Sequence, residues 1–347
     1  MKRYSRQISI GDVLVGGGAP ITVQSMLNTK TTDVAGSLQQ INELRNAGCD
    51  LIRLAVPDEP SADGFKEIAT RCGLPLIADV HYSYKLAELA IKAGAKKLRM
   101  NPGNMSTDAE HIKTLVELLK DYGVPVRIGV NGGSLDKRFK GMNEDDALVA
   151  SALSTADTFE KFGFSDIVVA IKASNVITMI ESNRKLSKVC DYPLHLGVTE
   201  AGTLKSGLIK SSIGIGTLLE EGIGDTIRVS LSAPVVEEVY AGKAILRALG
   251  LKNSGVEVVS CPTCARTEID VQGLAEQVEQ MTAHITKPLK ISVMGCPLNG
   301  IGEGEGSDIG IAGGKEKSVL LKDGKIYKTI NSQDLMPEFL NLLNQVL

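Results

Sequence analysis

Eight short β-rich segments, each followed by a stretch with helical periodicity, constrain the fold of this chain most. The segments cover residues 21–26, 51–56, 76–80, 97–102, 124–130, 166–173, 194–201 and 226–231. Amphipathic stretches lie between them, among others at residues 36–47, 107–121, 145–162 and 235–249. Strands that alternate with helices at this spacing indicate βαβ units and a parallel sheet. Eight such units over about 250 residues are typical of an α/β fold, the closed (β/α)8 TIM-type barrel.

An open, doubly wound sheet is the alternative arrangement of the same units. No Gly-x-Gly-x-x-Gly pattern follows an early strand, which counts against a dinucleotide-binding sheet of that kind. Residues 7–15, followed by three glycines, predict a hairpin that covers the lower end of the barrel. Aromatic residues make up only 4% of the chain and tryptophan is absent, so we expect an aliphatic core, as in most parallel sheets.

The strand–helix alternation ends near residue 250, where the polar stretch 251–255 begins. The remaining residues predict, in order, a strand, a Cys-Pro-Thr-Cys motif, a helix, a second strand, a glycine-rich loop, a hairpin and a closing helix. This order is typical of a small α+β domain. We therefore expect two domains, a barrel over residues 1–252 and an α+β domain over residues 253–347.

Charge and hydropathy exclude several classes of protein. The 38 Lys and Arg residues against 41 Asp and Glu give a formal net charge of −3, which argues against a nucleic-acid-binding protein. No apolar run reaches about 18 residues, so we expect no membrane span. The basic N-terminus lacks the apolar stretch of a signal peptide, which favours a cytoplasmic protein. Six cysteines in such a chain favour metal binding or catalysis over disulfides.

Polar side chains interrupt the apolar strands near their C-terminal ends. The basic ones are Arg53, Arg99, Arg127, Lys172 and Arg228. Active sites of this fold lie at that end of the barrel, and residues two apart on a strand share a face. Any single basic residue is explained equally well by a structural ion pair. Five that converge on one mouth exceed the carboxylates there, Asp79 and Glu200, and therefore predict an anionic substrate such as a diphosphate.

The six cysteines fall into two groups. Three stand alone just before predicted strands and are typical of buried apolar residues, namely Cys49, Cys72 and Cys190. The other three form a Cys-x2-Cys pair and a later cysteine in a glycine-rich segment, namely Cys261, Cys264 and Cys296. Three thiolates fit an iron–sulfur cluster with one unusual ligand, or a zinc site that recruits His284. Spacing alone leaves both alternatives open.

Longer segments around these residues carry a likeness to one known family. They are QSMLNTKTTDV (24–34), ADVHY (78–82), KLRMNPGN (97–104), VRIGVNGGSLD (126–136), IKASN (171–175), VTEAG (198–202), KSSIGIGTLLEEGIGDTIRVSL (210–231), SCPTCART (260–267) and MGCPLNGIGEGEGSDIGIAGG (294–314). Nearly end to end, the chain resembles 4-hydroxy-3-methylbut-2-enyl diphosphate synthase of the methylerythritol phosphate isoprenoid pathway, in its compact two-domain form. The two cysteine segments are the most specific part of the resemblance.

The resemblance implies an iron–sulfur oxidoreductase. Its reaction would be the reductive ring opening and dehydration of 2-C-methyl-D-erythritol 2,4-cyclodiphosphate to 4-hydroxy-3-methylbut-2-enyl diphosphate. A [4Fe–4S] cluster would be held by Cys261, Cys264, Cys296 and the carboxylate of Glu303. Reduced flavodoxin or ferredoxin would supply the electrons, and each active site would be shared between the two chains of a homodimer.

The same matching assigns roles to the polar residues of the barrel. The residues that would bind the cyclodiphosphate are Arg53, Arg99, Arg127, Asn131, Lys172, Arg228 and Ser230. Glu200 would donate a proton or stabilise charge, and Asp79 and His81 would line the mouth. Ala265 and Ile301 stand where the family usually has Gly and Pro. Both flank the expected cluster ligands and replace none of them, so they bear on the rigidity of the loops and not on the ligand set.

Two rival functions fit the residues without the resemblance. One is a zinc-stabilised barrel lyase in which Lys172 forms a Schiff base with a phosphorylated carbonyl substrate. The other is a non-catalytic module that carries a cluster or binds phosphate. The metal content of the purified protein separates these functions, since a cubane cluster brings about four iron atoms per chain.

Overall fold

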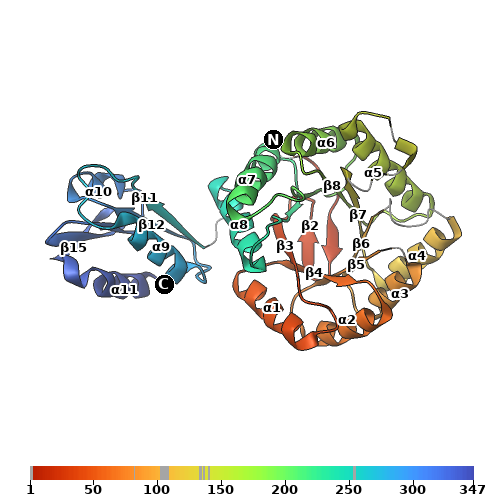
Figure 1. Ribbon diagram of the computed structural model, residues 1–347, viewed down its shortest axis with the longest axis horizontal. Coiled ribbons are helices and arrows are strands. Elements are labelled where there is room, and N and C mark those ends of the chain that lie inside the picture. The colour runs from red at the N-terminus through yellow and green to blue at the C-terminus, as the bar shows by residue number, and fades with distance from the viewer. Residues whose placement is uncertain are drawn as a thin grey trace. The chain divides into compact units, whose positions relative to one another are not determined.

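The computed structural model describes residues 3–81, 83–101, 109–132, 135, 137–139, 141–252 and 255–347. The chain divides into two compact units, Met1–Lys252 and Asn253–Leu347. The first unit contains an eight-stranded sheet surrounded by helices, and the second contains a five-stranded sheet (Figure 1).

Parallel strands form the wall of the first unit and confirm the predicted barrel. They are β3 (Thr22–Met26), β4 (Leu51–Val56), β5 (Leu76–Val80), β6 (Lys97–Met100), β7 (Val126–Asn131), β8 (Ile167–Lys172), β9 (His195–Leu196) and β10 (Thr226–Ile227). Their order around the wall is β8-β7-β6-β5-β4-β3-β10-β9. A parallel bridge between Val169 and Leu194 joins the two outer strands and closes the barrel.

Helices surround this wall (Figure 1). They are α1 (Val34–Asn46), α2 (Glu59–Arg71), α3 (Tyr84–Lys92), α4 (Ala109–Tyr122), α5 (Glu144–Lys161), α6 (Val176–Val189), α7 (Leu204–Glu220) and α8 (Val235–Ala248). Short polar side chains cap the starts of several helices. Asp33 accepts a hydrogen bond from the Gly36 backbone N–H at 3.0 Å, and Asp58 accepts one from the Ser61 backbone N–H at 2.9 Å. Such caps satisfy amide groups that have no partner inside the helix.

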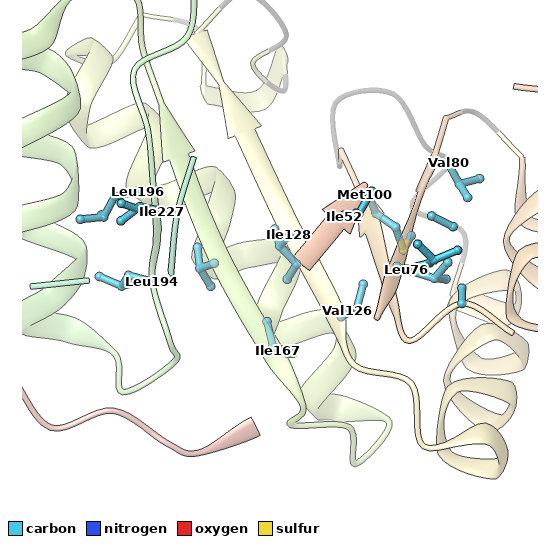
Figure 2. Close-up of a cluster of buried hydrophobic side chains, with 14 of the residues drawn as sticks. Ile52, Leu76, Val80, Met100, Val126, Ile128, Ile167, Leu194, Leu196 and Ile227 are labelled. Atoms are coloured by element: carbon cyan, nitrogen blue, oxygen red, sulfur yellow. The ribbon is translucent and has the colours of Figure 1, made fainter. Parts of the chain in front are cut away.

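The two faces of the barrel strands carry different side chains. Outward-facing aliphatic residues such as Ile52, Leu98, Ile128 and Val169 are fully buried beneath the helices. Figure 2 shows further members of this cluster, which come from most strands of the wall. Burying one such side chain stabilises the fold by roughly 1.5–3 kcal/mol. The hydrophobic core is therefore a shell between wall and helices, which leaves the inner face of the strands free for polar residues.

Strands β9 and β10 are shorter than the predicted segments 194–201 and 226–231. At Gly197 the backbone passes so close to its neighbours that a Cβ atom would lie 2.5 Å from the Arg228 carbonyl oxygen and 2.7 Å from Lys172 Nζ. The regular ladders of β9 and β10 end just before this point, at Leu196 and Ile227. As a consequence, Glu200 and Ser230 lie in loops beyond the strands on which they were expected.

The N-terminal hairpin consists of β1 (Ile8–Ile10) and β2 (Val13–Val15), which pair antiparallel. Ile10 and Val15 pack on Leu51 and Ile77, which stand on the inner face near the N-terminal ends of β4 and β5. The hairpin therefore closes the lower end of the barrel with an apolar plug, as predicted.

The second unit is built on one sheet with the strand order β11-β12-β13-β14-β15. The strands are β11 (Val256–Ser260), β12 (Leu289–Met294), β13 (Ile309–Ala312), β14 (Lys317–Lys322) and β15 (Lys325–Asn331), and the first three run parallel. Helices α9 (Val271–Thr282) and α11 (Leu335–Val346) contribute to one core cluster of this sheet. Helix α10 (Pro297–Glu303) packs through Ile301 on a second cluster that contains Ala312 and Leu321.

Among the described residues, no helix combines the length and the apolar character needed to cross a lipid bilayer.

Candidate active site

Basic side chains converge inside the barrel. Arg53, Arg99, Arg127 and Lys172 are each at most 7% exposed, and Arg228 lies beside them. Register explains the convergence, because Arg99 is paired with Asp79 on one side and with Arg127 on the other. The structure thus brings together all five basic residues that the sequence singled out, and we call this group the cation basin.

Two carboxylates neutralise part of the cation basin. Asp79 accepts a hydrogen bond from Arg99 Nη1 at 2.9 Å and forms an ion pair with Arg53 Nε at 3.5 Å. Burial opposes the charge of Asp79, yet Arg53, His81 and Arg99 together hold the pKa of its carboxyl group well below the usual range. Arg228 pairs with Glu238 of α8, Nη2 to Oε1 at 3.1 Å. Asp79 therefore aligns two arginines, a positioning role that the sequence had left open.

Arg127 and Lys172 have no such partner within the described part of the chain. Nε and Nη1 of Arg127 are buried without a hydrogen bond. Burial and the neighbouring arginines Arg53 and Arg99 lower the pKa of Arg127 well below its usual value. Burial, Arg127 and Arg228 do the same to the pKa of Lys172. Since an arginine keeps its charge in proteins, this half of the basin needs an anion to offset the cost of burial.

Further polar residues lie deeper in the barrel and were missed by the sequence analysis. Lys97 is fully buried, with Nζ 3.5 Å from Gln24 Oε1, and His195 Nδ1 lies 3.3 Å from Thr226 Oγ1. Burial, Arg127 and Arg53 lower the pKa of Lys97. Lys97 stands two residues before Arg99 and therefore shares its face of the strand. The same period of two that singled out Arg99 would have predicted Lys97 on the inner face. These side chains form a polar floor beneath the cation basin.

The remaining predicted residues of the barrel lie at its rim. Asn131 ends β7 and Ser230 follows β10, and both are partly exposed. His81 Nε2 lies 3.2 Å from Asp79 Oδ1. Glu200 is exposed and has a φ of +52°, a backbone conformation that is costly for a residue with a Cβ atom. Such strain is typical of residues held in place for function.

Replacing Lys172 by methionine is expected to stabilise the ligand-free barrel by roughly 1–3 kcal/mol, because an apolar side chain of similar length removes an unpaired buried amine. The lowered pKa of Lys172 means that its amine binds a proton more readily in the unfolded chain, so the contribution of Lys172 to stability rises with pH from its folded pKa up to about 10.4. This rise should be smaller in the variant. Thermal midpoints across pH, with and without inorganic diphosphate, provide the measurement.

Diphosphate should stabilise the wild type more than Lys172→Met, because the variant keeps the arginines of the cation basin and loses only the lysine. A variant that unfolds at a lower temperature than the wild type would contradict the prediction. Lys188→Met, in the last turn of α6, is the matched control and should change neither property.

The second unit gathers the three clustered cysteines and Glu303. Parallel strands β11 and β12 end side by side, which brings Cys261 and Cys296 together, and the Gly295 N–H donates to Cys261 Sγ at 3.2 Å. A pocket of about 170 Å³ is lined by Cys261, Cys264, Cys296 and Glu303. The Cys264 N–H is fixed by Thr267 Oγ1 at 2.9 Å. We call this the thiolate pocket.

The donors of the thiolate pocket fit an iron–sulfur cubane better than a single zinc ion. Among the described residues, no three His, Cys, Asp or Glu side chains are close enough to hold one ion. A cubane is itself several atoms wide, so its ligands line a space larger than a single ion needs, and the pocket here has a volume of about 170 Å³. His284, the fourth ligand that a zinc site would recruit, does not line the pocket. Ala265 is exposed and does not line the pocket.

The other cysteines lie apart from this pocket. Cys49 is buried, and burial raises the pKa of its thiol to about 12. Burial also raises the thiol pKa of Cys72 and Cys190. Thiols in this state are poor nucleophiles and poor metal ligands, which agrees with a structural role in packing.

Fold and site together define a class: a TIM-barrel enzyme for a multiply charged anion, linked to an α+β domain that carries three clustered cysteines. Residues 5–243 match the GcpE TIM-barrel domain, and residues 257–345 match the GcpE protein C-terminal domain. The chain therefore belongs to the GcpE family.

Curated relatives match over almost their whole length. The chain is 53% identical to 4-hydroxy-3-methylbut-2-en-1-yl diphosphate synthase (flavodoxin) of Caldanaerobacter subterraneus subsp. tengcongensis, covering 100% of this chain and 98% of the relative. Proteins of the same name from Fusobacterium nucleatum and Clostridium perfringens are 47% and 46% identical, each over 99% of this chain and 98% and 99% of the relative.

Two solved structures with a similar fold are distant from this chain in sequence. Dihydropteroate synthase of Yersinia pestis gives a TM-score of 0.52 at 14% identity, over 70% of this chain and 97% of that chain. N-acetylneuraminic acid synthetase of Leptospira borgpetersenii gives 0.51 at 14% identity, over 81% of this chain and 98% of that chain. At this level of identity the likeness concerns the fold alone.

Proposed function

We propose that this chain converts 2-C-methyl-D-erythritol 2,4-cyclodiphosphate to 4-hydroxy-3-methylbut-2-enyl diphosphate. The reaction consumes two electrons and one proton, opens the ring and releases one water. The observation that carries the proposal is the combination, in one GcpE-family chain, of an undercompensated cation basin with a pocket of three thiols and a carboxylate. A cyclic diphosphate supplies the negative charge that Arg127 and Lys172 lack.

Each residue set has a separate task in this reaction. Cys261, Cys264, Cys296 and Glu303 would hold a [4Fe–4S] cluster, which when bound supplies single electrons and a Lewis-acidic iron. The cation basin binds and orients the diphosphate, and the bidentate guanidinium groups fix its oxygens. Asn131 and Ser230 add neutral hydrogen bonds at the rim. Glu200 holds the proton that the departing oxygen takes up when water forms.

Two kinds of protein partner are part of the proposal. Reduced flavodoxin, the donor in the relatives' name, or ferredoxin delivers the electrons. A second copy of the chain completes each active site. Strands of a TIM barrel end at the mouth and helices run back, so α8 ends at Ala248 on the opposite face, about 20 Å below the mouth. The linker that follows is short, which favours a thiolate pocket that serves the partner's barrel.

Glu200→Gln is expected to lower turnover about 10²-fold or more while iron content and substrate affinity stay unchanged, because the amide cannot transfer a proton. Steady-state rates with reduced flavodoxin, together with iron analysis, measure the effect. Glu220→Gln, another exposed glutamate in the same unit, is the control. Wild-type turnover in Glu200→Gln would remove this residue from the reaction.

Anaerobic purification followed by an activity assay tests the proposed function as a whole. The protein should be brown, contain about four iron atoms per chain and convert the cyclodiphosphate with reduced flavodoxin. A colourless protein with stoichiometric zinc, whose Lys172 is trapped by borohydride in the presence of a phosphorylated carbonyl compound, would overturn it in favour of the lyase.

A further inference from the structure

Glu238 is buried in the first turn of α8, a helix outside the barrel wall. Its carboxylate accepts hydrogen bonds from Arg228 Nε at 3.2 Å and Arg228 Nη2 at 3.1 Å. It also accepts one from Ser25 Oγ of β3 at 3.0 Å and one from the Leu231 backbone N–H at 3.2 Å. One side chain thus joins β3 and the segment that follows β10 to a helix.

These contacts lie where the regular sheet has ended. The ladder of β10 stops at Ile227, so Arg228, Ser230 and the Leu231 N–H continue without regular pairing to β3. The Glu238 carboxylate takes the place of a backbone acceptor for Leu231. It also orients one edge of the Arg228 guanidinium, while Arg228 remains close enough to Arg53, Arg127 and Lys172 to affect their pKa values.

We propose that Glu238 is a positioning residue that fixes Arg228 and the Arg228–Leu231 segment against β3, and so sets the affinity of the cation basin for diphosphate. Charge supports this role. A carboxylate that engages Nε and Nη2 of Arg228 holds the planar fork in one orientation, and Nη1 remains for a ligand oxygen. The amide of a glutamine at this position would direct its own N–H donors at the N–H groups of Arg228 and Leu231, which need an acceptor.

The test compares Glu238→Gln with Glu237→Gln, the same substitution at the preceding position of the helix, where the side chain is partly exposed. In holoenzyme, Glu238→Gln should raise the KM for the cyclodiphosphate about 10- to 100-fold and change kcat less than threefold, since a charge-assisted hydrogen bond has been lost. Glu237→Gln should match the wild type. Glu238→Asp, which keeps the charge, should be intermediate and serves if Glu238→Gln does not fold.

A double-mutant cycle with Arg228→Ala separates positioning from general stability. Adding Glu238→Gln to Arg228→Ala should raise the KM much less than it does in the wild type, because the guanidinium to be positioned is gone and only the contact with the Leu231 N–H is lost. The inference would be overturned if Glu238→Gln raised the KM by the same factor in Arg228→Ala as in the wild type. A wild-type KM in the single variant Glu238→Gln would overturn it too.

Calorimetry with inorganic diphosphate keeps this test independent of the proposed function on which the KM readout rests. Weaker diphosphate binding in Glu238→Gln, in a protein that does not convert the cyclodiphosphate, would support the positioning role and refute the function. If the wild type converts the cyclodiphosphate and Glu238→Gln binds diphosphate as tightly as the wild type, the proposed function is supported and the positioning role of Glu238 is refuted.

Discussion

Serine at Cys261, Cys264 or Cys296 is expected to abolish turnover. Each thiol lines the same pocket, and a hydroxyl group is a much poorer ligand for iron–sulfur iron than a thiolate. Loss of any one should lower the iron content as well as the rate. Iron analysis and reductive activity of anaerobically purified variants measure both. Full activity in Cys296→Ser would refute the assignment of the cluster ligands.

Alanine at Cys49, Cys72 or Cys190 provides the matched control. These thiols are buried or half-buried in the barrel, and their removal should cost about 1 kcal/mol of stability and no activity. Glu303→Ala should fall between the two groups, since three thiolates can retain the iron while turnover is lost. The contrast distinguishes a ligand that holds the cluster from one that prepares it for substrate.

Mixing two inactive chains is expected to restore activity if each site is shared between protomers. Arg127→Ala damages the cation basin, and Cys261→Ser damages the thiolate pocket. In a heterodimer with shared sites, one site combines an intact basin with an intact pocket, and the other carries both defects. Half of the wild-type activity per heterodimer is therefore the expected upper value.

Co-expression with two different affinity tags allows the heterodimers to be isolated before the assay. Homodimers of either variant, prepared in the same way, are the negative controls. If every chain uses its own pocket, each site of the heterodimer carries one defect. An isolated heterodimer without activity would rule out the shared site.

Much of the barrel could be predicted because strands impose a period of two. Arg53, Arg99 and Arg127 could be assigned to one inner face by sequence spacing, and the structure places them together. The close approach at Gly197, just beyond β9, could not be predicted, because it depends on Arg228 and Lys172 from other segments of the chain.

The residues that position the cations were harder to find. Asp79 was visible as a strand carboxylate, but its contacts with Arg53 and Arg99 depend on side-chain direction. The sequence did not single out Glu238, since an acidic residue in the first turn of a helix is common and usually solvent-exposed. In the second unit, the Cys-x2-Cys spacing predicted a metal site, whereas the approach of Glu303 depends on how α10 packs on its sheet through Ile301.

The separation of an aliphatic shell from a charged interior has a consequence for how such a protein can change over time. The inward-facing residues of each strand bind the ligand, and the outward-facing residues stabilise the fold. Selection can therefore change one of these two sets with little effect on the other. A new ligand requires new inner side chains whose summed charge it can match, while the outward Ile, Leu and Val residues keep the scaffold intact. The same strands can thus diverge in chemistry long before they diverge in shape.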